Sequence, residues 1–323
     1  GPRPNSEPET AAISDFLLKQ KNLGACLYYH TSGGEHLRGL CIDTDDKMHP
    51  ADLAMYKALG QRGTDHTGYP VKSLFVDYTN RVPQWGTFLD MTFTYLGMFS
   101  YATELWDLMG RAGVKDGSWL KISKMTPTEQ EEVQLKLLKW NDEVMSGECF
   151  VNWHEYDHPQ LGTVEIGGWT PKYGRQNPPA KLLQEECHKN MLFSLAFAAS
   201  LPGLTISDLK TEKIAESVYR VTGKVENSGF LPTSGSNQAE INKIAAPVKV
   251  SLCGAEILQG EQDAEIGHLK GYGSTAGGYM NVSGAGSKKK VEWLVRANPG
   301  NCITVQAYAP RAGRASACIE IVE

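Results

Sequence analysis

The chain has 323 residues and a formal net charge of −5, and 41% of its residues are hydrophobic. This length suffices for about two domains with a sizeable core, and the lack of an arginine-rich segment argues against a nucleic-acid partner. The longest apolar stretch, from Met191 to Leu201, is interrupted by serines and is too short to span a membrane. The seven cysteines are scattered without a C-x-x-C pair. They leave one or two disulfides open, but they exclude a disulfide scaffold and a structural zinc site.

Helical and strand patterns alternate along residues 1–203 and predict an α/β layer architecture. Capping boxes at 6–9 and 126–129 each mark the start of a helix, and residues 62–86, rich in Gly, Thr, Asp and Pro, indicate a loop. Residues 23–29 are apolar at nearly every position, which is typical of a central strand covered on both faces. We expect helices over residues 10–20, 50–60, 126–145 and 179–200, and strands over residues 23–29, 98–103 and 163–166.

The pattern changes after Leu201-Pro202-Gly203, where helical periodicity stops and short alternating runs begin. Clusters of Gly, Ser, Asn and Pro separate these runs, which favours an antiparallel β-sandwich. We therefore predict two domains, residues 1–203 and residues 204–323. The predicted strands of the second domain cover residues 217–224, 248–253, 291–297, 302–309 and 315–322.

Two ionisable side chains, His30 and Glu104, lie at the ends of apolar, β-prone runs. Strand ends deliver side chains into clefts, so we expect the two strands side by side, with both side chains at the same edge of the sheet. A neutral imidazole is a suitable zinc ligand, and a carboxylate beside a zinc-activated water is a suitable general base. A structural histidine and a salt-bridged glutamate are the alternative interpretations.

The His30 turn (Thr31-Ser32-Gly33-Gly34) and Ala102-Thr103-Glu104-Leu105 resemble the zinc metallocarboxypeptidases, the carboxypeptidase A-like family, whose catalytic domain residues 1–203 would partly cover. In that family a strand-end His binds zinc, and a Glu in a T-x-E-L motif is the general base. Here the threonine stands one position later than in the motif. The resemblance implies a mixed sheet flanked by helices, Zn²⁺ bound by His30, catalysis by Glu104, and peptide or protein C-termini as substrates. Bacterial members carry a C-terminal β-sandwich, and the resemblance favours a secreted or periplasmic location.

The same resemblance gives roles to Tyr69 and Leu89. Tyr69 lies in the region of the family's mobile-loop tyrosine, which closes over the terminal carboxylate of the substrate, although on the residues alone it is a solvated loop tyrosine. Leu89 falls at the position that selects the C-terminal side chain of the substrate. A leucine there implies a preference for an apolar or aromatic residue, whereas an aspartate would favour Lys or Arg.

The first half of the family's metal site has no counterpart in this chain. That half contains an H-x-x-E motif upstream of the His30 strand, and no H-x-x-E occurs here; His49-Pro50-Ala51-Asp52 is the nearest approach. A catalytic zinc site needs about three protein ligands, so His30 alone would not hold the metal tightly. We expect a companion N-terminal segment of the same catalytic domain to supply the remaining ligands and the strands beside the His30 strand.

Two other motifs compete for a metal. His154-Glu155-Tyr156-Asp157-His158 fits H-E-x-x-H, which binds zinc on a continuous helix, but Pro159 disfavours a helix at His158, and we expect a loop instead. The acidic stretch from Asp43 to Asp52 has oxygen ligands for calcium, but its spacing is not that of an EF-hand, and a helix-capping loop accounts for it better.

Three functions are therefore open. The leading one is a zinc carboxypeptidase; the second is a related zinc amidohydrolase or deacylase that removes an acyl or amino-acid group from another substrate. The third is a non-catalytic fragment that binds peptide through its β-sandwich.

Overall fold

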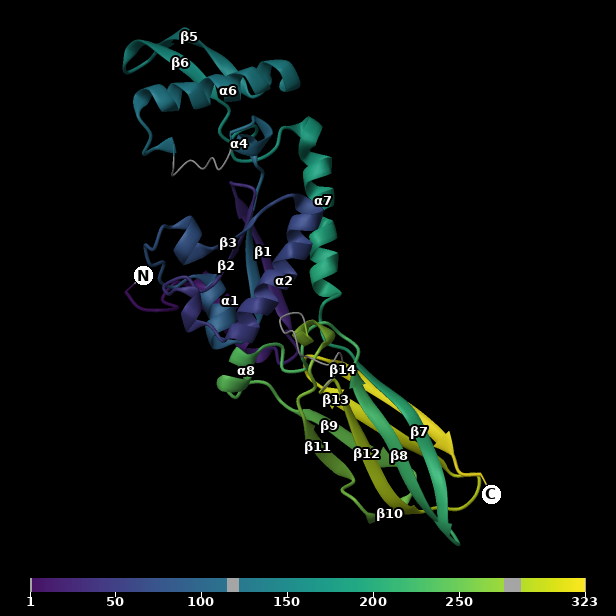
Figure 1. Ribbon diagram of the computed structural model, residues 1–323. Coiled ribbons are helices and arrows are strands. Elements are labelled where there is room, and N and C mark those ends of the chain that lie inside the picture. The colour runs from purple at the N-terminus through teal and green to yellow at the C-terminus, as the bar shows by residue number, and fades with distance from the viewer. Residues whose placement is uncertain (1, 115–121, 276–285, 323) are drawn as a thin grey trace.

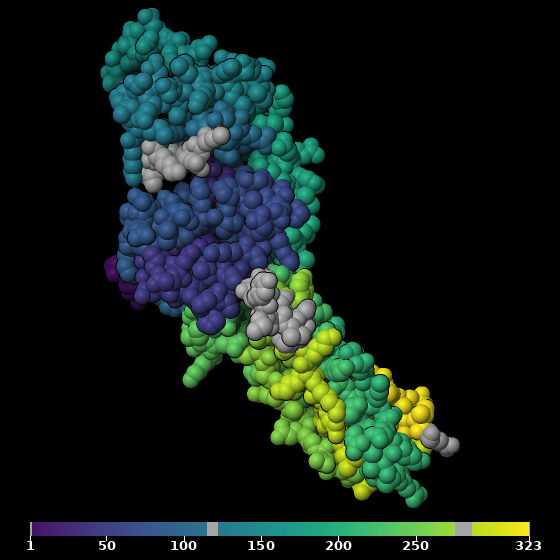
Figure 2. Space-filling view, viewed as in Figure 1, coloured from purple at the N-terminus to yellow at the C-terminus, as the bar shows by residue number. Residues whose placement is uncertain are grey.

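The computed structural model describes residues 2–114, 122–275 and 286–322 and shows a mixed α/β protein with several sheets (Figure 1). The molecule is elongated: residues 122–169 lie at one end, the C-terminal strands lie at the other, and the first part of the chain lies between them (Figure 2). The elements up to residue 114 are α1 (Pro8–Lys19), β1 (Ala25–Thr31), β2 (Glu35–Arg38), η1 (Asp45–Lys47), α2 (Pro50–Thr67), β3 (Val71–Ser73), η2 (Leu74–Tyr78), α3 (Phe88–Asp90), η3 (Met91–Tyr95), β4 (Phe99–Leu105) and α4 (Leu108–Arg111).

The first sheet has the strand order β1-β4-β2-β3. It is mixed, because β1 runs parallel to β4 while β2 runs antiparallel to β4 and parallel to β3. Helix α2 packs with α7 (Ala180–Ala198) on one face, where an aromatic core forms. This aromatic core contains Tyr56, Leu59, Phe99, Tyr101, Phe193 and Phe197. The coarse expectation of a mixed sheet flanked by helices is confirmed.

The opposite face of the sheet is covered by a smaller buried cluster, and one strand edge is open. Leu37, Cys41, Leu89 and Ala102 form the cluster, with Tyr28, Leu74 and Tyr78 packed against it. Strand β1 pairs only with β4 among the described residues, so it is an edge strand. The expectation of a central, doubly covered strand over residues 23–29 is therefore not met within this part of the chain.

A separate unit lies at the end of the molecule away from the C-terminal strands (Figure 1). It consists of α6 (Pro127–Met145), β5 (Phe150–His158) and β6 (Gly162–Trp169). The capping box at Thr126 and Glu129 is confirmed, because each side chain bonds the backbone of the other residue. The loop expected around His154 is wrong: β5 and β6 form an antiparallel pair in which His154 lies opposite Ile166. A strand excludes the helical geometry that H-E-x-x-H requires, so this motif is not a zincin site.

Two further expectations about helices are wrong. Helix α1 has Glu7 at its N-cap without a side-chain bond, so the capping box at 6–9 is absent. Helix α2 continues to Thr67, through the start of the predicted loop at 62–86. Its glycines allow close packing rather than chain reversal: a Cβ at Gly60 would lie 2.5 Å from the Val71 side chain, and one at Gly63 would lie 3.0 Å from the His36 ring.

From Leu204 onward the described elements are strands, apart from α8 (Asn237–Ile241) and η4 (Tyr272–Thr275). They form two four-stranded antiparallel sheets, β10-β12-β8-β7 and β11-β9-β13-β14, which enclose a core that includes Val221, Val250, Trp293 and Val305. The sequence pattern missed β7 because bulges interrupt its alternation. The strands are β7 (Leu204–Ala215), β8 (Val218–Asn227), β9 (Val248–Cys253), β10 (Glu256–Gln259), β11 (Asp263–Gly267), β12 (Lys288–Arg296), β13 (Cys302–Ala309) and β14 (Gly313–Glu320).

Charged side chains join the first sheet to the C-terminal strands. Arg311, in the turn between β13 and β14, donates hydrogen bonds to the carbonyl oxygens of Leu96, Gly97 and Ser234. Asp52, at the start of α2, accepts bonds from the backbone N–H groups of Asn237 and Gln238. These contacts fix the beginning of β4 and the beginning of α2 against the β-sandwich.

Candidate functional site

The structure brings His30 and Glu104 together at the ends of two parallel strands, as the sequence predicts. They are paired residues in the register of β1 and β4, and His30 Nδ1 lies 3.1 Å from Glu104 Oε2. The His30 side chain is 67% exposed, whereas that of Glu104 is 8% exposed. A solvent-accessible imidazole therefore lies directly beside a buried carboxylate.

The turn after His30 is folded back onto the end of β4. The Gly34 N–H donates to the Glu104 carbonyl oxygen at 2.8 Å, and the Gly33 N–H donates to that of Trp106. Gly34 has a φ of +67°, and a Cβ there would lie 2.3 Å from the Asp107 Cβ. Only glycine satisfies both requirements, so the small-residue turn is what lets β1 and β4 end at the same level.

A second carboxylate adjoins the pair. Glu35, the first residue of β2, is paired in register with Glu104 and is buried. Its Oε1 accepts a bond of 2.6 Å from Lys72 Nζ, while no partner for the buried Oε2 is found in the described part of the chain. Burial raises the pKa of the Glu104 carboxyl; the adjacent Glu35 adds to this rise, and His30 partly offsets it. A carboxylate with a raised pKa binds a proton more readily, as a general base at neutral pH requires.

His36 is a buried polar residue that the sequence analysis did not single out. It is 0% exposed, and its two ring nitrogens each lie 2.9 Å from a threonine hydroxyl, those of Thr103 and Thr67. Thr67 donates to the Gly63 carbonyl, so its oxygen is free to accept from one ring N–H while Thr103 donates to the other nitrogen. This arrangement suits the neutral imidazole, and burial lowers the pKa of His36 to about 4.

We expect His36 to make the protein less stable in weak acid. Because its pKa in the folded state, about 4, is below the ordinary 6.5, its contribution is complete above pH 6.5 and is lost as the pH falls toward 4. The full loss is about 3 kcal/mol. Urea unfolding at several pH values should show this loss in the wild type, while His36→Gln should flatten the dependence between these limits. His66→Gln, at an exposed histidine of α2, is the control; an unchanged slope in His36→Gln would contradict the assignment.

The structure places Tyr69 away from the role suggested by its position in the sequence. It follows α2 directly, is 2% exposed, and its hydroxyl accepts a hydrogen bond of 2.9 Å from the Trp106 N–H. Its ring also packs 5.5 Å from that of His36. The expected loop position is wrong because α2 extends to Thr67 and brings Tyr69 into the core. The residue therefore supports the end of β4 from the face opposite the His30–Glu104 pair.

Leu89 lies on the same face of the sheet as the His30–Glu104 pair, but further from the ends of the strands. It is fully buried and packs in the cluster with Ala102 and Leu37. Ala102 and Leu37 are paired in register, just as Glu104 and Glu35 are, and lie two residues along the strands from them. No part of it is open to solvent, so selection of a substrate side chain by Leu89 stays a prediction.

The donor set fits one part of a zinc site. His30 Nδ1 faces Glu104 and lies 3.0 Å from the Thr31 carbonyl oxygen, and no bond to its other ring nitrogen is found in residues 2–114, 122–275 and 286–322. A metal-binding His commonly donates its second N–H to a carboxylate or a carbonyl. Over the same ranges, no group of three or more His, Cys, Asp or Glu residues is placed to hold a metal ion. Zinc binding by His30 therefore stays a prediction from the sequence resemblance.

Glu35 and Lys72 are site residues that pattern reading missed. The sequence signal was the run Glu35-His36-Leu37-Arg38, in which three polar residues surround one apolar residue. In the structure this run is a strand whose four residues are all buried. Arg38 forms a bidentate pair with Asp45, which accounts for part of the acidic stretch considered for calcium. Sequence alone does not separate such a strand from a solvated turn, because burial is decided by the neighbours.

Comparison with known proteins adds little about function. A family model described as a domain of unknown function, DUF8731, matches residues 203–320, which is the strand-rich part of the chain. No match is found among curated protein sequences. In the described part of the chain, no helix has the length and apolar character needed to cross a membrane.

Solved structures match only weakly, and three of them are described as β-glucosidases. The GH3 enzyme of Bifidobacterium adolescentis is 12% identical, covering 37% of this chain and 17% of that chain with a TM-score of 0.18. β-Glucosidase 3B of Thermotoga neapolitana is 14% identical over 38% and 16%, also with a TM-score of 0.18. DesR of Streptomyces venezuelae is 14% identical over 37% and 15%, with a TM-score of 0.17. Each match involves a small share of the other chain, and TM-scores this low carry no argument about function.

Proposed function

We propose that this chain is the C-terminal portion of a zinc-dependent carboxypeptidase-like hydrolase that releases C-terminal residues from peptides. The observation that carries the proposal is the pairing of His30 and Glu104, with an exposed imidazole and a buried carboxylate 3.1 Å apart at one sheet edge. The sequence resemblance assigns these two residues to the zinc and to the attacking water, and their adjacency in the structure supports that assignment.

Each residue of the pair has a distinct part in the proposed reaction. Zinc, when bound through His30 and ligands from a companion segment, would supply Lewis-acid activation of a water molecule. Glu104 takes the proton of that water and returns it to the leaving amine. The position of Glu104 is rigid because its strand, β4, is paired with β1 on one side and with β2 on the other. The Lys72–Glu35 ion pair balances the second carboxylate beside it.

The open edge of β1 supports the proposal that a companion segment exists. Its residues Ala25–Tyr28 are partly exposed, although the run is apolar enough for a central strand. An unpaired apolar edge is a site for strand addition or aggregation. A strand added alongside β1 would bury this edge and come next to His30. We therefore place the missing ligands on a segment that pairs with β1.

The test is the composition of the protein in its native source. Intact mass spectrometry and metal analysis should find either a species larger than 35.4 kDa or a second chain, together with about one zinc per complex. His30→Ala should lose the zinc, whereas His66→Ala should keep it. A soluble, monomeric species of this chain's mass without zinc would refute the enzyme assignment for the chain.

Substrate class is tested separately on the same preparation. Release of the C-terminal residue from N-blocked dipeptides, with little hydrolysis of acylated amino acids, supports a carboxypeptidase. The reverse preference would support the amidohydrolase alternative and would leave the assignment of the metal and the base intact.

A further inference from the structure

The antiparallel ribbon of β5 and β6 is open to solvent on both of its edges. In the part of the chain that the structure describes, these two strands pair with each other and with no third strand. The ribbon lies at the end of the molecule away from the C-terminal strands (Figure 1). A two-stranded ribbon is marginally stable in water, and a third strand with a hydrophobic face is one way to stabilise it.

One face of the ribbon is apolar and exposed. Tyr156 lies opposite Val164 in register, and His154 lies opposite Ile166, so these four side chains share a face. The Tyr156 residue is 46% exposed and Ile166 is 40% exposed. Apolar side chains that gather on an exposed face, next to an unpaired edge, are typical of a surface that a partner covers.

The other face of the ribbon is acidic and lacks compensating cations. Glu155 lies directly opposite Glu165, and Asp157 follows on the same face of β5. All three are exposed, and none forms an ion pair within the described part of the chain. The Thr163 hydroxyl donates a hydrogen bond to Asp157 but leaves its negative charge in place. Like charges directly opposite each other destabilise an antiparallel pair, so a cation beside them would stabilise the ribbon.

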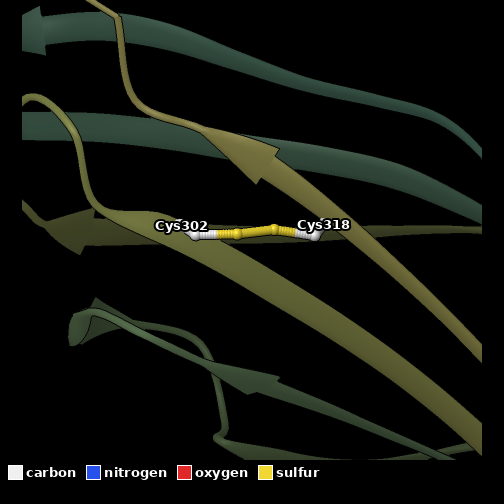
Figure 3. Close-up of a disulfide and its surroundings, with 2 residues drawn as sticks. All are labelled: Cys302 and Cys318. Carbon is white, nitrogen blue, oxygen red and sulfur yellow. A yellow bond between two sulfur atoms is a disulfide. The ribbon is translucent and has the colours of Figure 1, made fainter.

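The β-sandwich solves both problems within the chain. Its edge strand β14 is tied to β13 by the Cys302–Cys318 disulfide, whose Cα atoms are 6.3 Å apart (Figure 3). Glu226 on β8 lies directly opposite Lys288 on β12, and the two form an ion pair of 2.8 Å. Neither β5 nor β6 contains a cysteine, a lysine or an arginine. The cations that would balance the ribbon therefore have to come from outside its own strands.

We propose that the ribbon is a docking site for an extended, basic segment of another polypeptide, independent of the proposed hydrolase activity. The segment adds as a third strand along the open edge of β5. Side chains of a strand alternate between its two faces, so every second residue of the segment is a lysine or arginine beside Glu155 or Asp157. The residues between them are apolar and lie beside Tyr156.

Charge and backbone geometry together define this partner. An open strand edge can form main-chain hydrogen bonds with any extended peptide, and the side chains at alternate positions give the specificity. A second copy of this chain fits less well. Antiparallel pairing of two β5 strands about Tyr156 would set Glu155 of one copy opposite Asp157 of the other, and these like charges repel.

Binding of synthetic peptides to the whole chain tests the proposal. The probe is a fluorescein-labelled octapeptide of alternating lysine and valine, followed by fluorescence anisotropy as the chain is added. Its C-terminus is amidated, so that the result does not depend on the proposed hydrolase activity. We expect saturable binding that weakens as salt is added. An alternating glutamate–valine octapeptide should bind at least about tenfold more weakly.

A backbone-modified probe separates strand addition from simple charge attraction. The same lysine–valine peptide with every backbone nitrogen methylated keeps its side chains and its charge but has no N–H to donate. It should bind no better than the glutamate–valine peptide. In addition, the amides of residues 151–157 should exchange hydrogen more slowly when the unmodified peptide is bound.

Charge reversal locates the binding site on the chain. Glu155→Lys and Asp157→Lys should each weaken binding of the lysine–valine peptide by about tenfold or more. Glu132→Lys, at an exposed position of α6, changes the net charge by the same amount and should leave the affinity within about twofold. An equal loss in Glu132→Lys would reduce the effect to net charge and overturn the proposal.

Three further outcomes would overturn the proposal. The first is no binding of the lysine–valine peptide at chain concentrations up to about 1 mM. The second is equal binding of the glutamate–valine peptide or of the methylated peptide. The third is a dimer of the chain, detected by light scattering, that Tyr156→Ser dissociates, because the occupant of the ribbon would then be a second copy.

Discussion

Glu104→Gln is expected to lower kcat/KM for peptide hydrolysis by roughly 10²–10⁴-fold, because the substitution removes the proposed base. The protein should fold normally, since glutamine has the same shape and can still accept a bond from His30 Nδ1. The substitution also removes a buried charge next to Glu35, so the free energy of unfolding should stay the same or rise slightly. The measurements are initial rates on N-blocked dipeptides, zinc content and thermal unfolding of the complete, zinc-loaded protein.

The matched control for Glu104→Gln is Glu155→Gln, at an exposed position of β5. It should leave kcat/KM and zinc content unchanged. Near-normal turnover in Glu104→Gln, with zinc retained, would make Glu104 a structural residue. Loss of zinc together with activity would instead show that its main role is to orient His30.

Leu89→Asp is expected to unfold the protein rather than to change its substrate preference. Leu89 is 0% exposed and packs against Leu37, Cys41 and Ala102, and the neighbouring carboxyl of Asp90 already has its pKa raised by burial. Truncation of a buried leucine costs about 2–5 kcal/mol, and an uncompensated carboxylate adds to that cost. Domains are stable by about 5–15 kcal/mol, so most of the stability would be lost.

The control for Leu89→Asp is the same substitution at Leu161, which is 73% exposed in the turn between β5 and β6. Circular dichroism melts should show a large drop for Leu89→Asp and little change for Leu161→Asp. Leu89→Val keeps the site apolar and should fold with a smaller loss of stability. A folded Leu89→Asp protein that prefers Lys- or Arg-ended peptides would instead establish the pocket role predicted from the sequence.

The sequence predicted the positions of His30 and Glu104 because each ends an apolar run, and period and composition are local properties. The sequence analysis expected the two strands side by side, and the structure adds that they run parallel. Tyr69 could not be placed in the same way. The glycines of α2 are typical of loops, yet they are sites of close packing against Val71 and the His36 ring, and that contact exists only after folding.

Burial of polar strands was equally hidden from the sequence. Glu35 and Arg38 are among the most polar residue types, but each is buried with a partner of opposite charge, Lys72 and Asp45 respectively. Lys72 lies 37 residues after Glu35, so no short window of sequence contains both, and nothing in the sequence pairs Arg38 with Asp45 rather than with another nearby acidic residue. The edge position of β1 is a further case, since an apolar run indicates only that a strand needs covering.

The Arg311 contacts imply that force passes between the β-sandwich and the first sheet. Strand β4 begins just after the carbonyl groups of Leu96 and Gly97, which Arg311 holds, and it ends at Glu104 and Leu105 beside the turn of His30. A paired strand is stiff along its length and rises about 3.3 Å per residue. A force applied to the turn between β13 and β14 would therefore displace the far end of β4. The carboxylate of Glu104 is thus mechanically connected to a turn more than two hundred residues later in the chain.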